Sequence, residues 1–112
     1  MSSSEPSART QYVREVLRLY TSTPGVLGGV RRADRILAGQ LFDRRVPIYA
    51  VEHAFVLAAA RRILHNAFSA PMPPVRSLHY FQGAIQEVLE RPPGPRDIDI
   101  LREKLAAHHS RS

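Results

Sequence analysis

Residues 31–62, RRADRILAGQLFDRRVPIYAVEHAFVLAAARR, limit the possible folds more than any other part of the chain. Apolar residues recur at three- and four-residue spacing on both sides of Pro47, as on helices, and no stretch alternates as a strand does. Proline suits the first turn of a helix. The pattern therefore predicts two helices, over 31–43 and 47–66, joined by a very short turn.

Three further segments carry helical periodicity, at 10–21, 78–90 and 97–108. Prolines and glycines separate these segments, because neither residue continues a helix well. The predicted fold is all-α, a compact five-helix bundle with the helices of 31–66 as its central pair. The expected organisation is a flexible tail over 1–9, a helical core domain over 10–91, and a Pro-rich linker with a short C-terminal helix over 92–112.

The charge of the chain indicates an anionic partner. Sixteen basic residues face ten acidic ones, which gives a net charge of +6, and Lys104 is the only lysine among them. An excess of positive charge favours nucleic acid as a partner. A coding bias toward arginine in a GC-rich, bacterial-type genome explains the arginine count equally well.

Half of this net charge lies at the first helix of the central pair. Five arginines against Asp34 and Asp43 leave +3 between residues 31 and 45. We expect these arginines to hold DNA phosphates, which sets affinity and register but not the choice of sequence. In the alternative interpretation, the two aspartates pair locally with arginines and the surface is merely solvated. The arginines are Arg31, Arg32, Arg35, Arg44 and Arg45.

The turn of the central pair resembles that of the helix-turn-helix DNA-binding superfamily. Arg45-Val46-Pro47 and Val51 follow the pattern G-V-(S/P)-x-x-x-V, and Leu41 stands where the first helix of that motif packs inward. The resemblance covers about a fifth of the chain and implies that the second helix enters the major groove. Arg45 occupies the position usually held by glycine, where a positive φ costs another residue roughly 1 kcal/mol or more.

The resemblance also implies which side chains read bases. The expected exposed positions at the start of the second helix are Ile48, Tyr49, Glu52 and His53. Tyr49 and His53 would contact bases or phosphate, and Glu52 would accept a hydrogen bond from a cytosine amino group. The rest of this helix is apolar nearly all round, which is typical of a buried helix.

Two other groups of polar residues have competing interpretations. Arg76, His79 and Tyr80 form a possible surface for a partner or for single-stranded nucleic acid, since aromatic rings and arginine stack on bases. The alternative is that Tyr80 belongs to the core and His79 is solvated. Arg61 and Arg62 lie toward the end of a helix, where cations complement its dipole.

No motif of an enzyme, a metal site or a cofactor site is present. The chain has no cysteine, its five histidines include no HExxH, and it lacks a G-x-S-x-G elbow. We therefore expect no catalytic residues, no metal and no cofactor. The longest apolar run, 54–60, is far below the roughly 18 residues of a membrane span. With no secretory signal pattern at its start, the chain is expected to be cytoplasmic, without a membrane partner.

Together these observations predict a small, basic, non-enzymatic DNA-binding protein. The alternative is a protein-interaction subunit of a nucleoprotein complex, or a regulator that binds an acidic protein. Its support is the apolar helix of 47–66 and the apolar stripe of 78–89, which together exceed the needs of one small core. A homodimer is compatible with both.

Overall fold

The computed structural model describes the backbone of residues 7–111 and the side chains of residues 7–108. This part of the chain contains five α-helices, one 3-10 turn and no strand, so the all-α five-helix prediction is confirmed. The only β-type pairing within it is an isolated parallel bridge between Val26 and Val75. The elements are α1 (Ala8–Ser22), α2 (Arg32–Asp43), α3 (Ile48–Phe68), η1 (Leu78–Phe81), α4 (Gln82–Glu90) and α5 (Pro95–Arg111).

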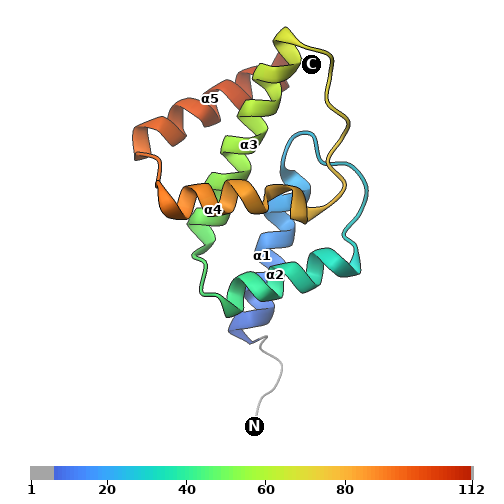
Figure 1. Ribbon diagram of the computed structural model, residues 1–112, viewed down its shortest axis with the longest axis vertical. Coiled ribbons are helices and arrows are strands. Elements are labelled where there is room, and N and C mark those ends of the chain that lie inside the picture. Colours follow the sequence, from blue (N-terminus) through green and yellow to red (C-terminus); the bar gives the residue numbers. More distant parts are fainter. Residues whose placement is uncertain (1–6, 112) are drawn as a thin grey trace.

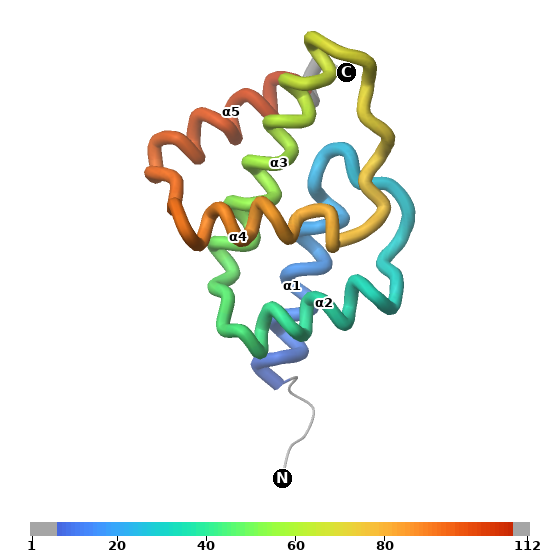
Figure 2. Tube along the Cα trace, in the orientation of Figure 1, coloured from blue at the N-terminus to red at the C-terminus, as the bar shows by residue number. Residues whose placement is uncertain are grey.

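Helix α3 is the central element of the bundle (Figure 1). It packs against α1, α4 and α5, whereas α2 packs mainly against α1. Figure 2 shows the extended connector 69–77 running beside the loop that follows α1. The bridge between Val26 and Val75 fixes this contact. Helix α2 and the C-terminal end of α3 lie at opposite ends of the molecule (Figure 1).

Three aromatic rings from three elements form the centre of the core. Phe81 lies with its ring centroid 4.7 Å from that of Phe55 and 6.1 Å from that of Tyr20. All three side chains are buried, together with Val16, Leu37 and Leu41. Edge-to-face aromatic contacts of this kind add about 1 kcal/mol each to the burial of apolar area. They hold α1, α3 and η1 together.

The ends of the chain differ from the predicted organisation. Helix α1 begins at Ala8, inside the segment predicted as a tail, and the Ser7 hydroxyl caps it by accepting the Thr10 N–H at 3.1 Å. The remainder of that tail, residues 1–6, lies outside the described residues. The C-terminal helix is longer than expected, since it begins at Pro95, a favoured first residue, and buries Ile98. The first turn of the predicted helix 78–90 is 3-10.

Candidate nucleic-acid interface

Asp34 organises the start of α2. Its side chain is only 1% exposed. Its Oδ2 accepts the Arg31 backbone N–H at 2.9 Å, and its Oδ1 accepts the Leu78 backbone N–H at 2.9 Å. One buried carboxylate therefore joins the first turn of α2 to the first residue of η1, which lies 44 residues further along the chain.

This contact brings together two groups that the sequence analysis treated separately. Leu78 follows Arg76 by two residues, so the backbone at Arg76 lies near the first turn of α2. The Arg76 Nη1 lies 4.0 Å from where a Cβ on Gly28 would stand, in the loop before α2. The Val26–Val75 bridge supports the same placement, with the Leu27 N–H donating to the Val75 carbonyl at 2.9 Å. His79 is exposed next to these cations. We call Arg31, Arg32, Arg35 and Arg76, all exposed, the α2 N-terminal surface.

Arg44 and Arg45 lie at the opposite end of α2 and are exposed. The helix has 12 residues, so its two ends are about 18 Å apart. Arg45 has a φ of 60°, the left-handed conformation, at the position where the resemblance places a glycine. Hydrogen bonds fix the turn: Val46 N–H donates to the Leu41 carbonyl at 3.0 Å, and the Tyr12 hydroxyl donates to the Val46 carbonyl at 2.7 Å.

Within the described residues, the guanidinium groups of the arginines around α2 form no ion pairs. The ion pairs are Arg9–Asp43, Arg18–Glu15, Arg61–Glu87 and Arg102–Glu52. Among the described residues, no carboxylate oxygen lies within 4 Å of a guanidinium nitrogen of the six arginines at the two ends of α2. The local ion pairs of Asp34 and Asp43 with these arginines, which the alternative interpretation assumed, are therefore not formed. The solvated surface that it also assumed stays a prediction.

Asp43 instead pairs with an arginine from α1. The Arg9 Nε donates to the Asp43 Oδ1 at 3.1 Å, and this hydrogen bond lowers the pKa of Asp43 below its usual value. The guanidinium of Arg9 lies against Gly39, where a Cβ would collide with it. A glycine in the middle of α2 therefore permits the contact that neutralises the nearest acidic residue.

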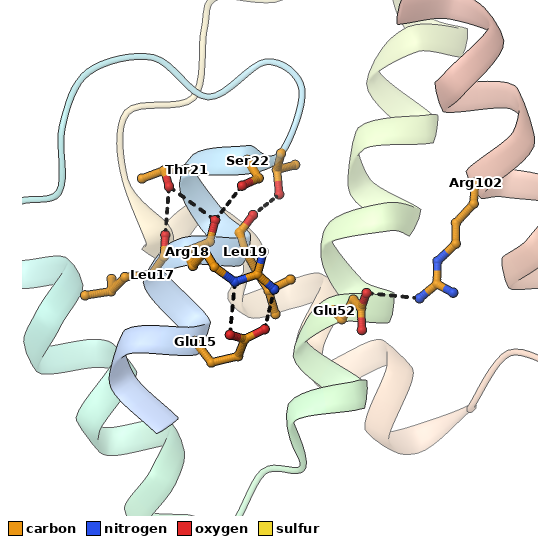
Figure 3. A network of polar contacts seen from close by, with 9 residues as sticks. Glu15, Leu17, Arg18, Leu19, Thr21, Ser22, Glu52 and Arg102 are labelled. Atoms are coloured by element: carbon orange, nitrogen blue, oxygen red, sulfur yellow. Dashed lines mark hydrogen bonds and ion pairs between the residues drawn. The ribbon is translucent and has the colours of Figure 1, made fainter. Parts of the chain in front are cut away.

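The start of α3 is less accessible than the resemblance led us to expect. Tyr49 is 60% exposed, but Ile48, Glu52 and His53 are half-buried. Glu52 pairs with Arg102 of α5, whose Nη2 lies 3.2 Å from the Glu52 Oε2 (Figure 3). The His53 ring packs edge to face on Tyr49, with centroids 5.7 Å apart. The expectation of four exposed positions is wrong for three of them, because Ile48 packs against the core, Glu52 is engaged by α5 and His53 lies against Tyr49.

Arg62 has a structural role that the sequence analysis missed. It is only 7% exposed, and its Nη2 donates to the Pro73 carbonyl at 2.7 Å. Its guanidinium also lies over the Tyr80 ring, 5.5 Å from the centroid, and donates to the Tyr80 hydroxyl at 3.3 Å. Arg62 thus fastens the connector 69–77 to α3 and orients Tyr80, which stays 45% exposed. The signal in the sequence was an arginine within an otherwise apolar helix.

Arg61, the neighbour of Arg62, binds Glu87 of α4 through two hydrogen bonds, of 2.8 and 2.6 Å. Neither residue acts mainly on the dipole of α3, because each is engaged by a specific partner. In the part of the chain that the structure describes, no three histidine or acidic side chains are grouped so that they could hold a metal ion. Within the same part, no helix combines the length and hydropathy that crossing a bilayer requires.

Comparisons with protein-family models, with curated proteins and with solved structures find no match to this chain. A functional conclusion therefore rests on the geometry and charge of the described residues.

Proposed function

We propose that this protein binds duplex DNA, mainly by contacts between arginines around α2 and phosphates. The observation that carries the proposal is that the side chains of six exposed arginines form no ion pair with a carboxylate among the described residues. An unpaired guanidinium offers a planar set of donors that matches phosphate oxygens. These arginines are the four of the α2 N-terminal surface together with Arg44 and Arg45.

The spacing of the arginines suits a duplex. The two ends of α2 are about 18 Å apart, and the major groove of B-DNA is about 12 Å wide. The distance between the two ends of α2 is therefore comparable with the width of one groove flanked by its phosphates. Such contacts position a protein on the duplex without selecting a sequence.

The start of α3 offers few side chains that could recognise a specific DNA sequence. Glu52 is engaged by Arg102, so it is not included in the proposed interface. Tyr49 and His53 lie just after the Arg45 turn, and they are the side chains that remain near the groove. The proposal is accordingly a duplex-binding protein with weak sequence preference.

Salt dependence tests the proposal directly. Binding at six phosphates releases counterions, so raising the salt from about 50 to about 200 mM should weaken duplex affinity by roughly 2,000-fold, with a log–log slope near −5. Fluorescence anisotropy with a labelled duplex measures both quantities. Duplex affinity that is absent at both salt concentrations, or insensitive to salt, would refute the proposal.

A matched pair of double variants locates the interface. R32Q/R35Q and R91Q/R96Q both change the net charge from +6 to +4 (6 − 2 = 4), and all four arginines are exposed. The first variant should reduce the salt slope by about 2, whereas the second should leave it nearly unchanged. Equal losses in the two variants would mean that net charge, and not the surface around α2, determines binding.

A further inference from the structure

An apolar cleft lies between the C-terminal half of α3 and α5. This end of α3 and α5 lie on a different part of the molecule from α2 (Figure 1). The cleft has a volume of about 260 Å³. It is lined by Leu57, Ala60, Arg61, Ile63, Leu64, Ala67, Leu101, Lys104 and Leu105.

The α3 side of the cleft is a continuous apolar stripe. Leu57, Leu64 and Phe68 share one face of the helix, because residues four and seven apart lie above one another. Leu64 is 62% exposed and Phe68 is 82% exposed. The small side chains of Ala60 and Ala67 lie between them, which lets another backbone approach closely. Apolar side chains exposed to this extent at a cleft mark an interaction surface.

The rest of the apolar surplus expected from the sequence is used by the core. Leu78, Phe81, Ile85 and Val88 of the stripe of 78–89 are buried in the core, whereas Leu89 at its end is 38% exposed. The end of α3 is different because the chain leaves it at Ser69 as an extended connector. Among the large apolar side chains of the described residues, Phe68 and Leu64 near this end are the two most exposed.

The charged residues that line the cleft are both cations. Arg61 is engaged by Glu87 of α4. Lys104 has no carboxylate within 4 Å among the described residues. His65, on the turn of α3 that follows Arg61, is exposed as well. A partner that covers the apolar stripe therefore meets the positive charge of Lys104 at the edge of the cleft, whereas Glu87 compensates that of Arg61.

We propose that this cleft binds an amphipathic helix of another protein, one that carries acidic residues beside its apolar stripe. Helix-in-groove recognition uses anchors at three- and four-residue spacing, which the stripe of α3 complements. A second copy of this chain is disfavoured, because a two-fold contact through the cleft brings the Lys104 side chains of both copies to one interface. The cleft shares no residue with the surface around α2, so this proposal does not depend on DNA binding.

The probe is a pair of synthetic amphipathic helices with the same leucine stripe, flanked by glutamates in one peptide and by lysines in the other. Titration of the full-length chain, followed by ¹H–¹⁵N NMR, should show the glutamate peptide binding at least tenfold more tightly than the lysine peptide. Lys104→Glu should reduce this preference several-fold. Equal binding of both peptides, or binding of neither, would overturn the proposal.

A second set of variants locates the contact. Leu64→Asp changes an exposed side chain that lines the cleft, so the fold should be retained and binding of the glutamate peptide should weaken at least tenfold. Ile100→Asp is the matched control, since Ile100 is 43% exposed on α5 but does not line the cleft. Loss of binding in the control as well would contradict the assignment. Sedimentation that shows a dimer of the native chain, dissociated by Leu64→Asp, would identify a second copy as the occupant and overturn the proposal.

Discussion

Replacing Arg45 by glycine should stabilise the protein while weakening DNA binding. Arg45 has a φ of 60°, and this left-handed conformation costs a residue with a Cβ roughly 1–2 kcal/mol. Glycine avoids that cost but loses roughly 0.5–1 kcal/mol through the greater freedom of the unfolded chain. The Arg45 side chain is exposed and forms no ion pair within the described residues, so its removal adds little. The expected net gain in the free energy of unfolding is about 0.5–1 kcal/mol.

The matched variant is Arg45→Ala, which removes the same charge but keeps the left-handed residue. Urea denaturation should give Arg45→Ala a free energy of unfolding within about 0.5 kcal/mol of that of the native chain. Arg45→Gly should show a clearly higher midpoint at a constant m-value. Thermal unfolding should shift upward by a few degrees for the glycine variant, roughly 2–6 °C. Both variants should lose DNA affinity to the same extent.

Two results would refute this reasoning. Equal stabilisation by alanine and glycine would mean that relief of charge repulsion, and not backbone conformation, is responsible. Destabilisation by glycine would mean that the turn between α2 and α3 does not hold a positive φ at this position in solution.

Three further predictions concern the buried polar groups and the ion pairs. Asp34→Ala should lower the free energy of unfolding by about 3 kcal/mol, because two backbone N–H groups lose a charged acceptor; urea denaturation should show a smaller loss for Asp34→Asn, and equal stability of Asp34→Ala and the native chain would contradict this role. Tyr20→Phe should leave stability unchanged or raise it by up to about 1 kcal/mol, since the Tyr20 hydroxyl is buried without a hydrogen-bond partner among the described residues; a clear loss in thermal unfolding would reveal a partner. Arginine partners hold the pKa values of Asp43 and Glu87 below their ordinary values of 3.8 and 4.5. These groups stabilise the fold above those values, and stability should fall as the pH drops through them toward the lowered folded-state values; thermal unfolding should change little between pH 7 and pH 5, and R61Q should show a smaller acid-induced loss than the native chain.

The helices were largely predictable, because periodicity and breakers are local properties of the sequence. The errors lie where a single side chain or a neighbouring element decides a boundary. Ser7 starts α1 two or three residues before the periodic pattern does, and Pro95, expected to interrupt the chain, is the first residue of α5. Both are favourable end positions whose role depends on the residues that follow.

The candidate interface was predictable only in part. The arginines of residues 31–45 stand out by composition, and the structure places all five on the surface. Their freedom from carboxylates was not predictable, because it depends on Asp34 bonding to Leu78 and on Asp43 bonding to Arg9. The loss of Glu52 from the reading surface likewise depends on α5, a helix some 50 residues away in the chain.

The sequence by itself determined an all-α chain with an excess of arginine around a short turn, because helical periodicity and charge are encoded within a few neighbouring residues. Only the tertiary structure decided which arginines have partners, that Arg76 joins the start of α2, and that the apolar face of α3 stays uncovered at its end. These properties arise from contacts between residues far apart in the chain. Each depends on how neighbouring helices pack, and one buried carboxylate, Asp34, fixes the most important of them.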